Sequence, residues 1–213
     1  MFTGIVEEVG VLRSLRVGAA SAVLEVAATV VSGGCAVGDS ILTDGVCLTV
    51  TEVSPGGFTA DVMPETVRRS TLSERRPGDR LNLERALTLQ SRLGGHLVGG
   101  HSDGVGAVVS VTPERNALVV EFEVPAAVGL VSVAQGSIAV DGVSLTIVAV
   151  DGARLRVSLI PHTAAVTTLS RLKPGVRVNL EADLIAKYVH AFVAGRKPAD
   201  GLTWEKLAEA GFS

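Results

Sequence analysis

The sequence predicts an all-β fold of two tandem, homologous six-stranded Greek-key barrels followed by a C-terminal α-helix. The first observation is a repeat: a shift of 97 positions lays residues 40–87 on residues 137–184 without a gap, and 20 of the 48 positions are identical. The second is that each copy alternates short Val-, Ile- and Thr-rich segments with turns containing Gly, Pro or Asp, as in small barrels. The third is that apolar residues recur at helical spacing after residue 183.

The repeat also divides the chain. Solenoid units repeat every ~20–50 residues, so a period of 97 residues is the size of a domain. The 213 residues therefore separate into an N-terminal barrel (residues 1–96), a C-terminal barrel (97–183) and a helix with a tail (184–213). Two related domains offer two related sites, and differences between the copies mark where those sites have diverged.

In the first copy, segments with the length and composition of strands occur at residues 4–12, 22–31, 40–43, 47–53, 58–63 and 80–86. Asp44-Gly45 joins two of them and is a strong signal for a hairpin turn. Residues 64–72 are polar and favour a helical excursion before the last strand.

The second copy repeats this plan, with strands expected at residues 105–111, 117–124, 137–140, 144–150, 155–160 and 176–182. Asp141-Gly142 is the matching hairpin turn, and residues 125–133 favour a short helix.

The segment beyond Asp183 predicts a helix that ends at Gly195. Its apolar residues recur at the spacing of one helical face: Leu184, Tyr188, Val189 and Phe192. Because this face lies outside both barrels, we expect it to be buried against another subunit. Residues 203–210 favour one more short helix, with Thr203 as its N-cap.

Composition excludes several classes of protein. Hydrophobic residues make up 47% of the chain and the mean hydropathy is +0.43, yet no apolar run approaches the ~20 residues of a membrane span. The net charge is −3 without a basic run, which argues against a nucleic-acid partner. No secretory signal is visible at the N-terminus. Cys35 and Cys47 are therefore expected to be reduced thiols of a cytoplasmic protein.

Five motifs in this order resemble the α-chain type of riboflavin synthase, a family with tandem lumazine-binding domains. They are MFTGIVEEVG at residues 1–10, GVCLTV at 45–50, LGGHLVGGHSDG at 93–104, GSIAVDGVSLT at 136–146 and IPHT at 160–163. The resemblance implies dismutation of two molecules of 6,7-dimethyl-8-ribityllumazine, in which one gives four carbons to the other. It also implies riboflavin and 5-amino-6-ribitylaminouracil as products, no cofactor or metal, and a homotrimer held by the C-terminal helix. Association with lumazine synthase is a further partner that the resemblance brings into consideration.

A reaction between two copies of one molecule suits two related half-sites. In the family, the N-terminal barrel of one subunit faces the C-terminal barrel of a neighbour, and holding the two molecules together lowers the barrier through pre-organisation. The resemblance places these residues around the two lumazines: Phe2, Thr3, Gly4, Ile5, Val6, Ser40, Cys47, Leu48, Thr49, Asp61, Val62, Met63, Pro64, Glu65 and Thr66 in the first copy, and Gly100, His101, Ser102, Gln135, Ser144, Leu145, Thr146, Ser158, Leu159, Ile160, Pro161, His162 and Thr163 in the second.

The hydroxyl pairs Ser40/Ser137, Thr49/Thr146 and Thr66/Thr163 occur in both copies and would grip the ring and the ribityl chain. The alternative for each pair is that Ser and Thr simply suit strands.

Residues that differ between the copies are candidates for the chemistry, and four are expected to be catalytic: Cys47, His101, Ser144 and Asp183. Cys47 aligns with Ser144, Ile5 with His101, and Ala86 with Asp183. Imidazole exchanges protons near neutral pH, and Ser144 with Asp183 would activate a hydroxyl or a water. The alternatives are a structural His101, an inert core Cys47 and an N-cap role for Asp183.

His96 and His101 lie five positions apart, and Cys35 is not placed to help them. We therefore expect no zinc site.

Asp44 and Asp141 are explained by turn chemistry. Gln135 stands where many relatives carry a lysine that contacts the ligand, so that contact loses its charge. Ser102 and Asp44 also differ from the common family residues.

Two other functions compete with the enzyme. A lumazine-binding protein without turnover would show a degenerate C-terminal half-site, but both copies keep the DGV-[CS]-LT and P-x-T segments. A flavin reductase would need an NAD(P)H domain, and no G-x-G-x-x-G follows a strand.

Overall fold

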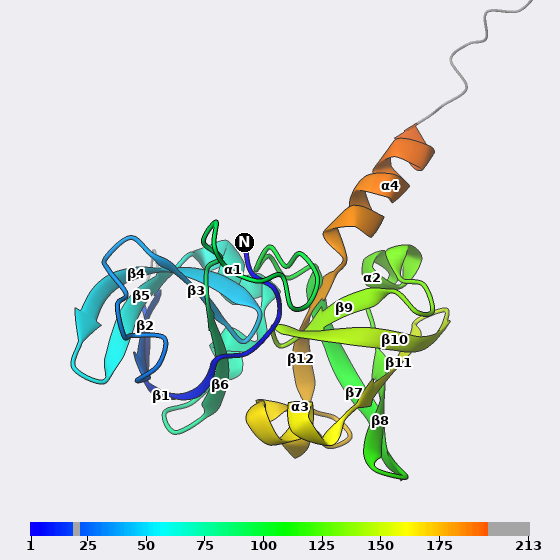
Figure 1. The fold of residues 1–213 in the computed structure, drawn as a ribbon, viewed down its shortest axis with the longest axis horizontal. Helices are drawn as coiled ribbons and strands as arrows, with labels where there is room; N and C mark the ends of the chain where they lie inside the picture. Colours follow the sequence, from blue (N-terminus) through cyan, green and yellow to red (C-terminus); the bar gives the residue numbers. More distant parts are fainter. Residues whose placement is uncertain (19–21, 196–213) are drawn as a thin grey trace, which may run out of the picture.

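A computed structural model describes residues 1–18 and 22–195. Figure 1 shows two barrels side by side, with helix α4 (Leu184–Gly195) projecting from the second. The predicted all-β architecture with two tandem six-stranded barrels and a C-terminal helix is confirmed.

The first barrel contains six antiparallel strands in the order β1-β2-β5-β4-β3-β6, closed by pairing of β1 with β6. Strand β6 returns beside β3 after a long connection, which makes a Greek key. The strands are β1 (Glu8–Val17), β2 (Ala22–Ala27), β3 (Ser40–Thr43), β4 (Val46–Ser54), β5 (Gly57–Val62) and β6 (Arg80–Arg85). Helix α1 (Pro64–Arg69) and the 3-10 helix η1 (Thr71–Glu74) form the long connection.

The second barrel has the equivalent closed order of strands. Its elements are β7 (Gly104–Glu114), β8 (Ala117–Glu123), α2 (Ala126–Val131), β9 (Ser137–Val140), β10 (Val143–Asp151), β11 (Arg154–Leu159), α3 (Pro161–Val166), η2 (Thr168–Arg171) and β12 (Arg177–Ala182). Each barrel has its own apolar core, which contains the fully buried Phe58 in the first barrel and Phe122 in the second. Alternate residues of the strands face these cores, as the period of a strand requires.

Most predicted elements lie within a few residues of the observed ones, and two strand predictions have wrong bounds. The strand expected at residues 4–12 spans Glu8–Val17, because Phe2 pairs with Val98 and Gly4 bonds to Ser144 instead of continuing the sheet. The strand expected at residues 22–31 ends at Ala27. The helix expected at residues 203–210 lies outside the described residues. Within residues 1–18 and 22–195, no helix combines the length and hydrophobicity needed to cross a bilayer.

A nearly symmetric hydrogen-bond network joins the two barrels. The side chain of Asn82 accepts a hydrogen bond from Thr168 N (2.8 Å) and donates one to the Asp141 carbonyl (3.0 Å). In the reciprocal pair, Asn179 accepts from Thr71 N (2.8 Å) and donates to the Asp44 carbonyl (2.7 Å). The two copies of the repeat are therefore related by an approximate two-fold axis within one chain.

Asp44 and Asp141 do more than complete turns, which corrects the explanation based on turn chemistry alone. Both hairpin turns have the expected positive φ values (46° at Asp44, 43° at Asp141), but both carboxylates are buried between the barrels. Arg75 Nη2 lies 2.7 Å from Asp44 Oδ2 and 3.7 Å from Asp141 Oδ2. Burial raises the pKa of Asp44 to about 6, and burial together with the Asp44 charge raises the pKa of Asp141 well above its usual range.

Candidate functional site

A row of polar side chains crosses the outer face of the first barrel. Ser40 on β3 pairs with Thr49 on β4, and Thr49 pairs with Asp61 on β5. Residues directly opposite each other in a sheet point to the same face. Cys47 precedes Thr49 by two positions and therefore shares this face. Exposed Met63 follows at the start of α1. We call Ser40, Cys47, Thr49, Asp61 and Met63 the first row.

The second barrel carries the equivalent row. Ser137 on β9 pairs with Thr146 on β10, and Ser144 lies two positions before Thr146. Ser158 and Ile160 are the counterparts of Asp61 and Met63, and Ile160 is exposed beside α3. We call Ser137, Ser144, Thr146, Ser158 and Ile160 the second row.

Each row is completed by a segment that belongs to the other copy of the repeat. The carbonyl of Gly4 accepts a hydrogen bond from Ser144 N (2.8 Å), and the carbonyl of Gly100 accepts one from Cys47 N (2.8 Å). Both glycines have positive φ values, 75° and 81°. A Cβ atom would lie 2.6 Å from Ser144 Cβ at Gly4 and 2.5 Å from Cys47 Cβ at Gly100. Only glycine fits these close approaches.

The connector between the barrels delivers one histidine to each row. His101 directly follows Gly100 and is thereby brought to the Cys47 side of the first barrel. His96, five positions earlier, lies at Ser144 of the second barrel, with Nδ1 2.7 Å from Ser144 Oγ. Sequence reasoning treated His96 only as a poor zinc ligand and missed this pair, because no local pattern links positions 96 and 144. Among the described residues, no group of three His, Cys, Asp or Glu side chains could hold a metal ion.

The environment of His96 favours the neutral ring. Burial lowers its pKa, although the negative charge of Asp183 opposes this effect. With the proton on Nε2, His96 Nδ1 can accept the hydroxyl proton of Ser144. This geometry is that of a serine beside a general base.

The pH dependence of activity should report this pair. Because His96 is protonated only below the ordinary histidine value of 6.5, the base stays available as the pH falls to that point. We expect the acidic limb of kcat/KM to lie below pH 6.5 and to be lost in a His96→Gln variant. An acidic limb that lies above pH 6.5 and is unchanged in the His96→Gln variant would contradict the assignment of His96 as the base.

Asp183 has the capping role that was considered as its alternative. Its Oδ1 accepts a hydrogen bond from Ile185 N (2.7 Å) at the start of α4. It also lines a cavity with Ser137, and its negative charge opposes the lowering of the pKa of His96 by burial. Asp183 therefore fixes the helix and adds negative charge near Ser144.

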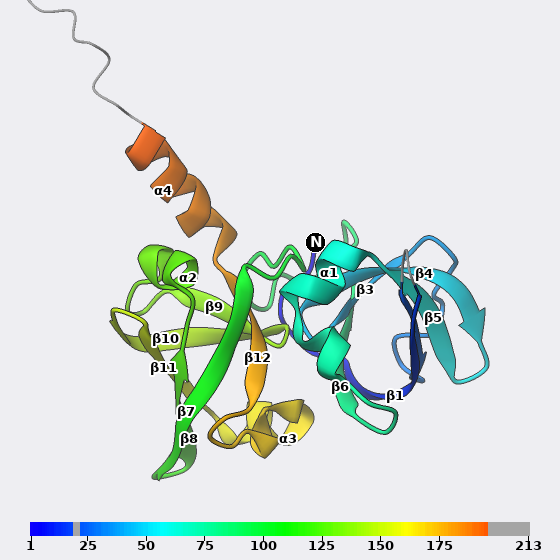
Figure 2. The ribbon, with the colours of Figure 1, turned by 180° about the vertical axis from the view of Figure 1, so that it is seen from behind.

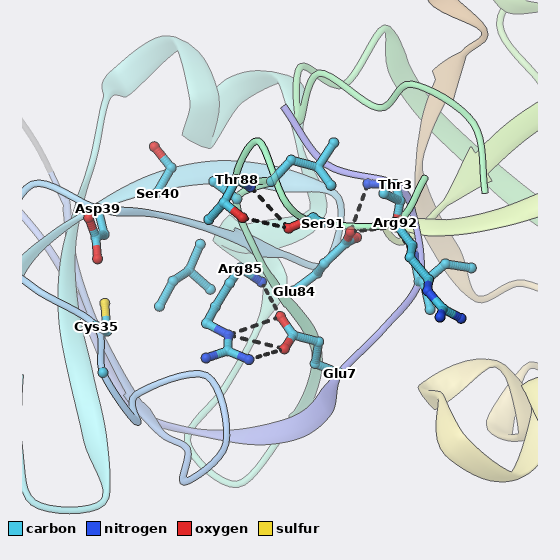
Figure 3. A pocket seen from close by; sticks show the side chains of 15 residues that line it. Thr3, Glu7, Cys35, Asp39, Ser40, Glu84, Arg85, Thr88, Ser91 and Arg92 are labelled. Carbon is cyan, nitrogen blue, oxygen red and sulfur yellow. Dashed lines mark hydrogen bonds and ion pairs between the residues drawn. The ribbon is translucent and has the colours of Figure 1, made fainter. Parts of the chain in front are cut away.

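Two cavities occupy equivalent places in the two barrels. The first, of about 630 Å³, is lined by Ser40, Ala86 and Cys35 and contains the Glu7–Arg85 ion pair (Figure 3). The second, of about 520 Å³, is lined by Ser137, Asp183 and the apolar side chains of α2 and α4. Since Ser40 and Ser137 belong to both a row and a cavity, each row continues into its cavity. The polar side chains of Asp39, Thr88, Ser91 and Arg92 also line the first cavity, beside apolar Ile5, Ile41 and Leu87.

Not all predicted site residues can offer their side chains to a ligand. Phe2, Leu48, Val62, Leu145 and Leu159 are at most 7% exposed, because they face the apolar clusters inside or between the barrels. A contact between any of these five residues and a ligand would therefore involve the backbone. The buried Thr3 hydroxyl instead donates to Glu84 (2.7 Å).

The remaining predicted residues lie on or near the rows. Pro64, Glu65 and Thr66 belong to α1, and Pro161, His162 and Thr163 belong to α3. Glu65 pairs with Arg68 and Arg69 on its own helix. Exposed Ile5 follows Gly4 at the second row, and part-buried Val6 packs against the second core. Ser102 follows His101 and donates to the Gly104 carbonyl (2.9 Å). Gln135 is exposed in a turn with a φ of 67° before β9.

The sequence is similar to riboflavin synthases along its whole length. The riboflavin synthase of Actinobacillus pleuropneumoniae is 43% identical over 216 residues, covering 100% of both chains. That of Mycobacterium bovis is 51% identical over 194 residues, covering 89% of this chain and 96% of the relative. That of Bacillus subtilis is 38% identical over 215 residues, covering 100% of both.

The fold is also that of LumP. A crystal structure of LumP complexed with riboflavin matches with a TM-score of 0.79 at 24% identity, covering 85% of this chain and 99% of LumP. At this identity the match shows the fold alone. The lumazine binding domain matches residues 3–86 and again residues 99–183. With two such domains and these relatives, the chain belongs to the riboflavin synthase family, as its motifs predicted.

Proposed function

We propose that this chain is a riboflavin synthase that converts two molecules of 6,7-dimethyl-8-ribityllumazine into riboflavin and 5-amino-6-ribitylaminouracil. The observation that carries the proposal is the pair of equivalent outer-face rows. Their hydroxyls recur at Ser40/Ser137 and Thr49/Thr146, whereas the equivalent positions between them carry Cys47 in the first row and Ser144 in the second. Equivalent binding hydroxyls combined with different reactive groups suit a reaction in which one copy of the substrate donates four carbons and the other accepts them.

The residues near Ser144 suit attack on one lumazine. Ser144 Oγ would add to C7 of the bound lumazine while the electron pair of the ring double bond at C7 moves into the conjugated ring nitrogens. The hydroxyl proton would pass to His96 Nδ1, which lies 2.7 Å from Oγ. On the other row, His101 would exchange the proton of the 7-methyl group, with Cys47 in contact with the ring. Thr146, Thr163 and the backbone of the rows would hold the pyrimidinedione edge.

We infer that a complete site combines the first row of one chain with the second row of another. Figures 1 and 2 show α1 and α3, which border the rows, on opposite faces of the chain. The first row of one chain would then face the second row of a neighbour. We infer a homotrimer built on α4, whose apolar side chains Ile185, Tyr188, Val189, Phe192 and Val193 are 56–75% exposed.

Ending the chain at Asp183 should abolish this assembly. The shortened protein loses the exposed apolar face of α4, whereas both barrel cores stay intact. We expect a soluble monomer by light scattering, with little turnover because no row meets its partner. A trimer that persists without α4 would contradict the assignment.

His101→Ala should lower the rate more than the affinity for lumazine. Loss of a positioned proton carrier is expected to lower kcat by roughly 10²-fold, while the first row still grips the ring. Steady-state kinetics and a lumazine titration separate the two effects. Unchanged turnover would remove His101 from the mechanism.

The proposed domain division remains residues 1–96, 97–183 and 184–213. Cys35 and Cys47 are both free thiols, which supports a reducing, cytoplasmic location. Association with lumazine synthase is a further proposal, and co-sedimentation of the two purified proteins would test it.

Incubation of the purified protein with the lumazine tests the function. Riboflavin absorbance should rise with time. Stable binding without any riboflavin would favour a lumazine-binding protein, and NADPH oxidation with bound flavin would favour a reductase.

A further inference from the structure

Two buried glutamates occupy equivalent positions in the last strand of each barrel. Glu84 in β6 and Glu181 in β12 are 5% and 3% exposed. Burial raises the pKa of both carboxyls, and backbone hydrogen bonds oppose the shift. Burying a carboxylate costs free energy unless its oxygens accept hydrogen bonds or pair with a cation. The groups that donate to these carboxylates therefore indicate the role of the two residues.

Each glutamate accepts three hydrogen bonds from one short segment. Glu84 accepts from Thr3 N (2.7 Å), Thr3 Oγ1 (2.7 Å) and Gly4 N (2.9 Å). Glu181 accepts from Gly99 N (2.6 Å), Gly100 N (2.8 Å) and His101 N (2.9 Å). Figure 3 shows the contact between Glu84 and Thr3. The two arrangements correspond under the repeat.

The held segments serve the opposite barrels. Gly4, held by Glu84 of the first barrel, accepts the hydrogen bond of Ser144 in the second. Gly100, held by Glu181 of the second barrel, accepts that of Cys47 in the first. Phe2 and Val98 pair where the two segments meet, with hydrogen bonds of 2.8 and 3.1 Å.

We propose that Glu84 and Glu181 are positioning residues with crossed targets. Glu181 fixes the backbone of His101 and Gly100 and so sets the geometry at Cys47. Glu84 fixes Thr3 and Gly4 and so sets the geometry at Ser144. Each barrel thereby completes the half-site of the other. The catalytic meaning of this arrangement rests on the proposed function.

Replacing each glutamate with glutamine tests this positioning role. Glutamine keeps the size of glutamate, but one carboxylate oxygen becomes an NH₂ group that faces N–H donors and cannot accept from them. The segment should then shift, whereas the apolar cores are untouched. Glu84→Gln and Glu181→Gln are matched controls for each other, because both remove the same chemistry from equivalent buried sites.

Two measurements without substrate read the two sites separately. In a Cys35→Ala background Cys47 is the only cysteine, and its alkylation rate by iodoacetamide reports the first row. The imidazole signals of the four histidines, followed by NMR titration, report His96 at the second row. Glu181→Gln should change the alkylation rate by about fivefold, the effect of one net hydrogen bond, and leave the His96 titration in place. Glu84→Gln should shift the His96 titration and leave alkylation within about twofold.

The proposal would be overturned if both variants changed the Cys47 alkylation rate and the His96 titration equally. It would also be overturned if Glu84→Gln changed only the alkylation rate and Glu181→Gln only the His96 titration. If Glu84→Gln does not fold, Thr3→Val removes one hydrogen bond to Glu84 and should shift only the His96 titration. Crossed effects in a protein that forms no riboflavin would overturn the proposed function and leave the crossed positioning standing.

Discussion

Replacing Ser144 with alanine is expected to lower kcat by about 10²–10⁴-fold, the range for a positioned acid–base group. The hydroxyl lies 2.7 Å from His96 Nδ1, and its removal takes away both the attacking oxygen and the proton that His96 accepts. Ser137, Thr146 and Ser158 remain in the second row, so the affinity for lumazine should stay near the wild-type value. Steady-state kinetics and a fluorescence titration of the bound lumazine check the two parts.

Two further variants make this test specific. Ser54→Ala, at the far end of β4, removes a serine away from both rows and should have wild-type activity. His96→Gln should cost about as much as Ser144→Ala, and the double variant no more than the larger single, because the pair acts as a unit. Multiplicative losses, or full activity of Ser144→Ala, would contradict the pairing.

Arg75→Leu should destabilise the protein by about 3–5 kcal/mol at pH 8, because two buried carboxylates lose the cation beside them. The second copy carries Leu172 at the equivalent position, so leucine suits the local backbone. Arg75 Nη2 lies 2.7 Å from Asp44 and 3.7 Å from Asp141. Denaturant unfolding of both proteins gives the difference in the free energy of unfolding.

The loss should shrink at low pH. The pKa of Asp44 is raised from 3.8 to about 6 in the folded protein, so the folded state binds the proton more tightly than the unfolded state between these values. This contribution to stability is therefore present at low pH and is lost as the pH rises toward 6. A protonated carboxyl no longer needs Arg75, and the double variant Arg75→Leu, Asp44→Asn should recover much of the loss at pH 8. A destabilisation independent of pH would show that Arg75 acts only through packing.

Local patterns in the sequence were sufficient to predict the barrels. Short runs of apolar and β-branched residues bounded by turns place strands such as residues 40–43 and 137–140 at their observed bounds. The Asp-Gly hairpin turns follow from the need for positive φ, which these residues tolerate. The repeat then extended the same interpretation from one copy to the other.

The crossed segments could not be predicted in this way. The contact between Gly4 and Ser144 joins positions 140 residues apart, and nothing near either glycine indicates its partner. For the same reason His96 was missed, and the burial of Asp44 and Asp141 was not foreseen. Phe2 was placed in the site by its motif, yet its side chain fills the contact between the barrels. Local sequence patterns predict which side chains of a strand point inward and which point outward. They do not predict which segment of the other barrel packs against the outward side chains.

The most direct test of two half-sites for one substrate is the mass balance of the reaction. Lumazine consumed, riboflavin formed and 5-amino-6-ribitylaminouracil formed are quantified together by chromatography during a time course with the purified full chain. Two unequal half-sites predict that two lumazines disappear for each riboflavin and each pyrimidine formed. Riboflavin formed from a single lumazine, or lumazine bound without any product, would contradict the account.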